Sequence, residues 1–487
     1  MEPLSWSGDL GTFLNPLMML AVVIFIAGFL ANLVLTLSGV RAGEMVVNPD
    51  HTLSLQRTPV DYALMAMKYA VLLFLLGCLG YIVGGVVLAS PERAGIIGGM
   101  AARLTPVWIA LVVLFAVSIT FKRKLGLYGK LFDSLIGMVG FGLVMFWIFT
   151  AVFAGMVATH GPIDVISQLR NAVPGSPLPT ADEGQYAWYL LGGDNLGRDV
   201  FSRVVYGAFE VLKIAPLATL FAFMVGITLG LPAGYYGGRL DTIITFIANL
   251  VLAFPVILLF YLLVTPEIVA AGIPNYLSLV LFIFPLLFLV VLFNSRYRTQ
   301  PPVRNIIVAA VLVLGGLAYL SLISDRSNAD LPALFRLWPE ALDLFDVPGN
   351  LLIVFVSVVF VNSPTVFRIV RGIVLDIKTR DYVAAGQTRG EGPWYIMLWE
   401  ILPNARGPLI VDFCLRIGYT TILLGTLGFF GLGVSPESPD WGSTINEGRR
   451  LLTVYPHPAL PPALALMSLV LGLNLLADGL REESLRD

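Results

Sequence analysis

Long apolar runs constrain this chain more than any other feature of its sequence. A helix needs about 20 consecutive apolar residues to cross the hydrocarbon core of a bilayer. Eleven stretches reach that length, at about 16–40, 62–88, 105–121, 134–157, 210–235, 243–264, 276–294, 305–324, 350–372, 407–432 and 461–480. The first is too long for the apolar core of a cleavable signal peptide and has no basic flank, so we expect it to be retained. The sequence therefore predicts an all-α polytopic membrane protein.

The composition indicates the same class of protein. Only 13% of the 487 residues are charged, whereas soluble globular chains carry about 25%. The net charge of −2 gives no reason to expect nucleic acid as a partner. The histidines His51, His160 and His457 are far apart in the chain, and Cys78 and Cys414 lie in apolar runs. We therefore expect neither a metal site nor a disulfide.

Basic residues fall unevenly between alternate connecting segments. With the N-terminus outside the cell, most Lys and Arg residues, including the FKRK cluster at 121–124, would lie on the cytoplasmic side. This distribution predicts an outer N-terminus and a cytoplasmic C-terminus. Two outer segments are then distinctive, a polar one at 158–209 and an acidic one at 325–349.

One polar stretch, DYVAAGQTRGEGPWYIMLWEILPN at 381–404, interrupts the apolar pattern on the predicted cytoplasmic side. We expect a first short helix that ends at Gly390 and Gly392, because glycine can adopt a positive φ. A second helix would begin at Pro393 and end at Pro403. Physical reasoning leaves two interpretations open: a knob that a soluble partner grips, or a hairpin that only caps the helix bundle.

The same stretch resembles the coupling loop, or EAA loop, of bacterial ABC importer permeases. The matching, and implied ATPase-coupling, residues are Asp381, Tyr382, Ala384, Ala385, Gly390, Ile396, Leu402, Pro403 and Asn404. The stretch departs from the family pattern at Ala384, where Glu is common, and at Glu400, where the peptide-permease branch usually has His. Four further segments, at 191–208, 230–259, 429–449 and 471–482, resemble C-type subunits of dipeptide and oligopeptide permeases.

The resemblance covers about 134–264 and 350–482 and implies a type I ABC importer transmembrane domain. That domain would have a core of about six helices, with about five additional helices. We expect extra spans at 1–133, the first core span and outer loop at 134–208, the transmembrane domain at 209–480 with a two-span insertion at about 265–349, and the coupling loop at 373–406. Peripheral packing is the simpler interpretation of the extra spans, and docking of an accessory subunit is the alternative.

The function implied by the resemblance is that of a permease subunit in an ATP-driven, binding-protein-dependent importer of peptides or similar small solutes. The implied location is the inner membrane. The implied partners are a second, B-type permease subunit, one or two ATPase subunits, an extracytoplasmic substrate-binding protein and membrane lipid. We expect no cofactor on this chain, since ATP–Mg would belong to the ATPase subunits.

The chain itself is not expected to be an enzyme. It lacks the G-x-x-x-x-G-K-[ST] phosphate-binding loop and the common hydrolase motifs, so we predict no catalytic residues. The alternative function is that of a secondary transporter driven by an ion gradient, for which carboxylates within spans would be expected. Asp412 is the clearest acidic residue within a span.

Polar residues at the predicted outer face and within spans have mainly structural interpretations. The family-like residues of the outer face are Gly197, Arg198, Asp199, Ser202, Arg203, Trp441 and Gly442. We interpret the first five as an elbow before a core helix and the last two as residues that order an outer segment. Contact with substrate or with a binding protein is the alternative. Asp412 and Arg416 predict an i, i+4 ion pair, and snorkelling explains Glu210 and Lys213.

Overall fold

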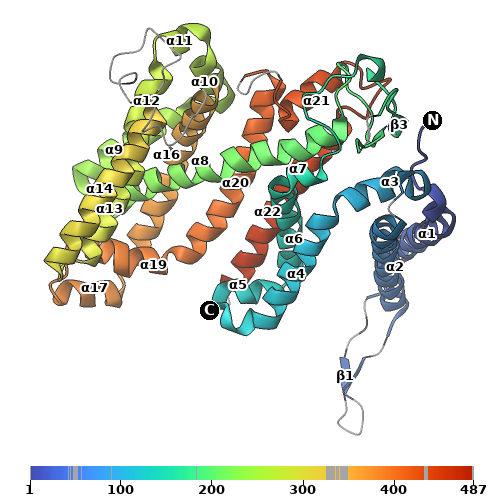
Figure 1. The fold of residues 1–487 in the computed structure, drawn as a ribbon. Helices are drawn as coiled ribbons and strands as arrows, with labels where there is room; N and C mark the ends of the chain where they lie inside the picture. Colours follow the sequence, from blue (N-terminus) through green and yellow to red (C-terminus); the bar gives the residue numbers. More distant parts are fainter. Residues whose placement is uncertain are drawn as a thin grey trace. The chain divides into compact units, whose positions relative to one another are not determined.

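The computed structural model contains two compact units, which are built almost entirely from helices (Figure 1). Unit 1 comprises Met1–Ile109 and Gly155–Ser202, and unit 2 comprises Ala110–Ala154 and Arg203–Asp487. The structure describes residues 2–41, 43, 45–47, 53–55, 57–88, 90–181, 184–324, 335, 339, 349–432 and 437–484. The acidic segment predicted at 325–349 therefore lies almost entirely outside the described residues.

Unit 1 is organised around two long helices, α1 and α2, and its strands form two short antiparallel pairs, β1–β2 and β3–β4. Its elements are η1 (Gly8–Leu10), α1 (Gly11–Leu37), β1 (Met45–Val47), β2 (Leu53–Leu55), α2 (Pro59–Leu88), α3 (Pro91–Arg103), η4 (Ser167–Leu169), β3 (Ser176–Pro177) and β4 (Trp188–Tyr189). Three helices cross the boundary between the units, namely α4 (Thr105–Phe121), α7 (Ala154–Val157) and α8 (Val200–Tyr236).

The contact between α1 and α2 depends on glycines that face larger side chains. A Cβ atom at Gly77 would lie 2.5 Å from Met18, and one at Gly80 would lie 2.9 Å from Leu14. The hydroxyl of Tyr81 donates to Asn15 Oδ1 across the same contact, at 2.5 Å. Small residues at a helix contact allow close packing where lipid provides no hydrophobic driving force between helices.

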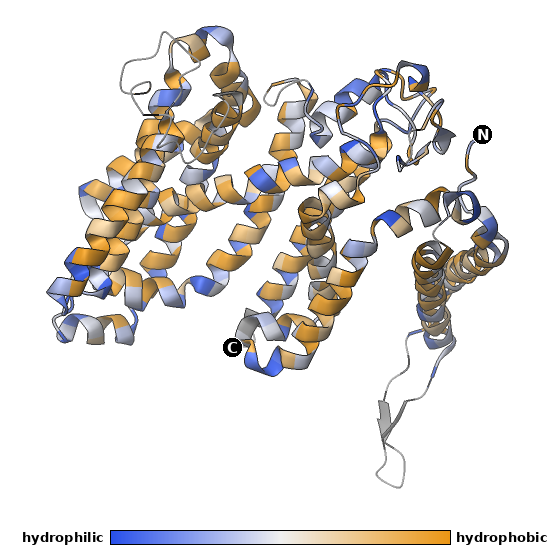
Figure 2. Ribbon diagram, viewed as in Figure 1, coloured by the Kyte–Doolittle hydropathy of each residue, from blue (hydrophilic) through white to orange (hydrophobic). Residues whose placement is uncertain are grey.

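Unit 2 holds the remaining helices. They are η2 (Lys122–Lys124), α5 (Gly126–Lys130), η3 (Leu131–Asp133), α6 (Leu135–Val152), α9 (Gly238–Ala253), α10 (Val256–Val264), α11 (Pro266–Ala270), α12 (Ile273–Leu281), α13 (Ile283–Arg296), α14 (Pro301–Ile323), α16 (Gly349–Ile377), α17 (Asp381–Thr388), α18 (Pro393–Tyr395), η6 (Ile396–Ile401), α19 (Leu402–Asn404), α20 (Arg406–Phe429), α21 (Trp441–Arg449) and α22 (Leu460–Ser484). Figure 2 shows that their polar residues gather at helix ends and connections. This distribution suits helices with lipid-facing middles.

The predicted spans agree with the structure at ten positions and differ at one. Ten helices among the described residues are long and apolar enough to cross a membrane. The sixth predicted span, at 243–264, is not one straight helix, because α9 and α10 meet at an angle of 84°. Phe254 is extended at the break, with φ −78° and ψ 135°, and Pro255 follows it. Proline disfavours helical geometry at the residue before it and donates no backbone hydrogen bond.

Two further features concern α8 and the crossing of α6 with α22. Helix α8 continues without a break from Val200, through the end of the predicted outer segment, to Tyr236. Helices α6 and α22 cross closely, since a Cβ atom at Gly140 would lie only 2.3 Å from the backbone nitrogen of Leu476. The indole of Trp147 donates to Ser468 Oγ across this crossing, at 2.9 Å.

Candidate coupling segment and outer-face residues

The candidate coupling segment, residues 381–404, connects α16 to α20 and begins with the two-turn helix α17. Gly390 ends this part with φ +75°, as predicted. Its backbone N–H donates to the carbonyl of Gln387, and the N–H of Glu391 donates to that of Gly386, at 2.9 and 3.2 Å. Gly392 does not adopt a positive φ: it has φ −71° and ψ 153°. The proline that follows it favours this extended geometry.

The second half of the segment begins at Pro393, as predicted, and then widens into a π-helical turn, η6. The prediction that Pro403 ends this helix is wrong, because Pro403 lies within α19 and Asn404 is still helical. A proline ring inside an α-helix crowds the carbonyl four residues earlier. The wider turn directly before Pro403 relieves that crowding, and the helical path runs on to Asn404.

The base of the segment is part of the apolar core of unit 2. Val383, Ile396, Met397 and Ile401 are almost completely buried among residues of α8, α16 and α20. Ile396 is only 1% exposed, so its part in coupling would be to hold the segment in place. The segment is therefore continuous with the helix bundle rather than a loosely attached knob.

The opposite face of the segment is accessible. Seven of the predicted coupling residues are exposed, and Leu402 is half-buried; the exposed ones are Asp381, Tyr382, Ala384, Ala385, Gly390, Pro403 and Asn404. Tyr382 and Asn404 also line a groove of about 560 Å³, together with Asp376 and Arg380 of the preceding segment. This face combines small residues with charged ones, which suits a close contact with another protein.

Polar contacts fix the two halves of the segment to each other and to α8. Arg389 lies 2.5 Å from a carboxylate oxygen of Glu400, which gives a structural reason for the departure from His at this position. The side chain of Gln387 donates to the hydroxyl of Tyr235 at 3.2 Å. Just before the segment, Lys378 Nζ donates to the carbonyl of Gly234, at 2.9 Å.

Helix α13, from the predicted insertion, makes contacts that the sequence analysis missed. The indole of Trp399 donates to Ser295 Oγ at 3.0 Å, and the guanidinium of Arg296 lies over the Trp399 ring, 4.8 Å from its centroid. Arg298 lies 3.8 Å from the carboxylate of Glu391. We call this contact the α13 brace. Its sequence signal is weak, because an aromatic residue and a basic helix end more than a hundred residues apart do not predict contact.

In unit 1, four of the residues predicted to lie at the outer face form a buried elbow at the start of α8. Gly197 has φ +90°, and a Cβ atom there would lie 2.2 Å from the carbonyl oxygen of Ile166. Arg198 pairs with Asp194 at 2.6 Å. Asp199 accepts hydrogen bonds from the backbone N–H and the hydroxyl of Ser202, at 3.2 and 2.6 Å. These contacts are those expected of an elbow that starts a helix.

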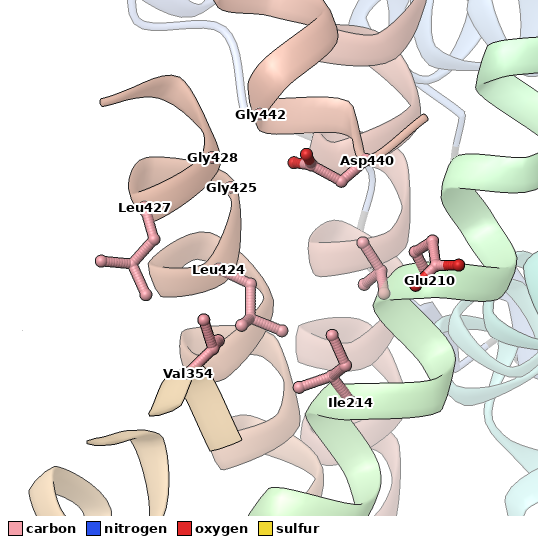
Figure 3. A pocket seen from close by; sticks show the side chains of 10 residues that line it. Glu210, Ile214, Val354, Leu424, Gly425, Leu427, Gly428, Asp440 and Gly442 are labelled. Atoms are coloured by element: carbon pink, nitrogen blue, oxygen red, sulfur yellow. The ribbon is translucent and has the colours of Figure 1, made fainter. Parts of the chain in front are cut away.

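In unit 2, Trp441 and Gly442, two more of the residues predicted to lie at the outer face, hold α21 against α8 and α20. Trp441 is fully buried, its indole donates to the carbonyl of Val204 at 2.9 Å, and its ring meets Trp147 edge-on at 5.0 Å. A Cβ atom at Gly442 would lie 2.1 Å from the carbonyl oxygen of Gly425 (Figure 3). Trp441 and Gly442 therefore pack α21 closely against its neighbours.

Unit 2 also contains the buried Arg203 and a partly buried ion pair within α20. One guanidinium nitrogen of Arg203 donates to the carbonyl of Ser438 and to Thr444 Oγ1, both at 3.1 Å, and lies 3.5 Å from Glu447. Asp412 and Arg416 form the predicted i, i+4 pair, at 3.4 Å. Among the described residues, no three His, Cys, Asp or Glu side chains are placed to hold a metal ion.

Comparison with known proteins identifies the family. Residues 226–482 match the profile of binding-protein-dependent transport system inner membrane components, over more than half of the chain. The chain belongs to this family. It is 30% identical over 301 residues to a glutathione transport system permease protein of Pectobacterium atrosepticum, covering 62% of this chain and 73% of the relative. It is 27% identical to a dipeptide transport system permease protein of Alkalihalophilus pseudofirmus, covering 73% of this chain and 87% of the relative. It is 28% identical to a dipeptide transport system permease protein of Haemophilus influenzae, covering 72% of this chain and 88% of the relative.

As a binding-protein-dependent transport permease, the chain is a multi-pass membrane protein with the transmembrane domain of ABC importers. The matched range begins within α8 and ends within α22, so it contains the whole candidate coupling segment. Helices α1 to α7 lie before it. In this family, ATP hydrolysis is carried out by separate ATPase subunits rather than by the permease component.

Proposed function

We propose that this permease imports peptides or similar small solutes, and that residues 381–404 transmit the motion of ATPase subunits to the membrane helices. The observation that carries the proposal is the combination of an exposed, family-like face with a base buried in the core of unit 2. A partner that pushes this face moves α8, α16 and α20 directly, because the buried base leaves little freedom for the segment to move alone.

The proposed assembly contains a B-type permease subunit, one or two ATPase subunits that carry ATP–Mg, and an extracytoplasmic substrate-binding protein. The named substrates of the relatives, dipeptides and glutathione, support a small amino-terminated cargo. The chain itself would bind no cofactor and hydrolyse no ATP. The N-terminus would lie outside and the C-terminus in the cytoplasm, on the same side as residues 381–404.

The proposed division of the chain follows the sequence prediction. Residues 1–133 would be an additional region, 134–208 the first core span with its outer loop, and 209–480 the transmembrane domain with an insertion at about 265–349. The wider coupling loop would run from 373 to 406. The contact of α13 with Trp399 supports a role for the insertion in steadying this loop.

Uptake by the reconstituted importer tests the proposal. Proteoliposomes that contain both permease subunits and the ATPases would be supplied with binding protein, labelled dipeptide and internal ATP. We expect ATP-dependent uptake that falls at least tenfold in Gly390→Trp, since a large side chain on the exposed turn would obstruct docking.

The matched control is Gly431→Trp. Gly431 has φ +71° and, like Gly390, has open space around its Cβ position. Its backbone N–H donates to the carbonyl three residues earlier, as that of Gly390 does, so the two glycines end their helices in the same way. Uptake that survives in Gly390→Trp, or that depends on an ion gradient instead of ATP, would contradict the proposal.

A further inference from the structure

A groove in unit 1 runs along one face of α3, the helix that connects α2 to α4 in the chain (Figure 1). Its volume is about 390 Å³, within the range of about 300–1,000 Å³ that is usual for small-molecule sites. The walls come from the end of α2, one face of α3, the first residue of α4 and Tyr186, all of them in unit 1. The proposed coupling mechanism uses none of these residues.

Small residues leave this groove open. Ala94, Gly98, Gly99 and Ala102 line it from α3, and Gly85 lines it from α2. The two helices touch closely here, since a Cβ atom at Gly85 would lie 2.5 Å from the carbonyl oxygen of Gly98. None of the five residues has a side chain larger than a methyl group. The groove therefore has an apolar floor above which the protein's own side chains leave space.

Arg103, the last residue of α3, adds a positive charge to the groove. Its Nε donates to the carbonyl of Val157 at 3.0 Å, and one terminal nitrogen donates to the carbonyls of Met156 and Ala158. These acceptors are uncharged, and within the described part of the chain no carboxylate pairs with Arg103 and no acceptor binds its other terminal nitrogen. The guanidinium is therefore a half-buried cation that is held in place and still has two N–H groups to donate.

The surroundings of Arg103 do not neutralise this charge. Its Cζ lies 5.7 Å from the centroid of the Tyr186 ring, and burial raises the pKa of Tyr186 to about 12, so the phenol stays neutral near pH 7. Asp199 also acts on Tyr186, but it is fully buried and accepts the hydroxyl of Ser202 at 2.6 Å. Among the described residues that line the groove, none is acidic. This end of the groove therefore favours an anionic group.

The position of the groove in the chain determines which anion is available. The candidate membrane span Pro59–Leu88 ends just before α3, and the next one, Thr105–Lys124, begins just after it. Consecutive spans end and begin at the same membrane surface, so α3 lies near the boundary of the hydrocarbon core. Phospholipid phosphates lie at this boundary, and each is attached to acyl chains that reach into the core.

We propose that the groove binds one anionic phospholipid, with its phosphate on Arg103 and an acyl chain along the small-residue face of α3. The two free N–H groups of Arg103 donate to phosphate oxygens through charge-assisted hydrogen bonds. The acyl chain packs against Ala94, Gly98 and Ala102, which leave room for it. Because Arg103 is already fixed by three backbone carbonyls, little freedom is lost when the phosphate binds. This site does not depend on which solute the importer carries.

Thermal unfolding of the full-length chain in detergent, after removal of co-purified lipid, tests the site. Dioleoylphosphatidylglycerol would be compared with dioleoylphosphatidylcholine at equal mole fraction, and with inorganic phosphate at matched ionic strength. We expect phosphatidylglycerol to raise the melting temperature by about 2 °C or more above the value in phosphatidylcholine, and phosphate alone to have no effect. Equal melting temperatures in the two lipids, or a rise of the same size with phosphate alone, would overturn the proposal.

Two positions test the two parts of the site separately. Arg103→Gln removes the charge and should abolish the difference between the two lipids, whereas Arg103→Lys keeps the charge and should retain most of it. Ala102→Leu fills the groove without changing the charge and should abolish the difference as well. Since Arg103→Gln also loses bonds to backbone carbonyls, each variant is compared with itself in the two lipids. If Arg103→Gln does not fold, Ala102→Leu decides the question alone.

Each substitution has a matched control. Arg93→Gln removes an exposed arginine of the same helix that pairs with Asp9 and does not line the groove. Ala27→Leu enlarges an exposed alanine of α1. Both controls should retain the full difference between the lipids. A difference that persists in Arg103→Gln and Ala102→Leu, or that disappears in the controls too, would show that the lipid effect does not come from this groove.

Discussion

The two ends of α20 carry family-like residues that the structure treats in opposite ways. At its Phe429 end, Trp441 and Gly442 are buried and tightly packed, with their backbone or side-chain atoms in direct contact with α8 and α20. At its Arg406 end, seven of the nine predicted coupling residues are exposed. The motif residues near Phe429 therefore stabilise the helix bundle. Those near Arg406 form an accessible surface, which their buried neighbours anchor to the core of unit 2.

Trp441→Ala should have the largest effect and should act on stability. The substitution empties a fully buried site and removes the hydrogen bond to the carbonyl of Val204, so we expect a loss of about 3–5 kcal/mol in the free energy of unfolding. Denaturation in detergent measures it. Trp394→Ala, at a position that is 37% exposed, is the control and should cost far less. Similar losses of stability for both tryptophan substitutions would contradict the distinction between buried and exposed motif regions.

Ile396→Ala should have the next largest effect, because it weakens the buried base of the coupling segment. We expect a loss of about 2–5 kcal/mol, the usual range for a buried isoleucine truncated to alanine. Ile410, which is 41% exposed on α20, provides the control substitution Ile410→Ala. If Ile396→Ala left stability unchanged, the segment would be less firmly anchored than its burial indicates.

Trp399→Phe should weaken the α13 brace by about 1 kcal/mol. The change removes the hydrogen bond to Ser295 and reduces the attraction between the ring and Arg296. A double-mutant cycle with Ser295→Ala isolates the hydrogen bond, since the two changes should not be additive. Fully additive losses would show that these side chains do not interact in the assembled protein. Trp394→Phe serves as the control.

Arg389→Gln should have the smallest effect on stability. The Arg389–Glu400 pair is partly exposed, with 55% of the arginine side chain accessible, and pairs of this kind contribute about 1 kcal/mol or less. The loss should shrink further at high salt because solvent-exposed charges are screened. Melting temperatures at low and high ionic strength measure this loss of stability. A large loss that does not depend on salt would show that Arg389 contributes to stability as a buried residue does.

Much of the fold could be predicted from the sequence because apolar length is a strong signal in a membrane protein. Proline was the less reliable signal. Pro255 marks the sharp bend between α9 and α10, yet α8 continues through Pro216 and Pro232, and α16 continues through Pro364. Neighbouring helices and local changes of helical geometry can compensate for a missing backbone donor. Proline alone therefore does not predict a break.

The candidate site was predictable in outline and not in its contacts. Spacing and residue type located Gly390 and Pro393 correctly, because both act on local backbone geometry. The burial of Ile396 and the α13 brace depend on residues distant in the chain, for which a single sequence contains no direct signal. The helical path through Pro403 was missed for a related reason, since the π-helical turn before it is not encoded by a simple motif.

Site-directed cross-linking of the coupling segment in the assembled importer tests the central claim most directly. A cysteine at Ala384, in a chain whose Cys78 and Cys414 are replaced by alanine, should cross-link to an ATPase subunit, with a yield that changes when ATP is bound. It should be labelled by a membrane-impermeant thiol reagent only from the cytoplasmic side. Labelling from the outer side of intact cells, or no cross-link to any ATPase subunit, would contradict the account.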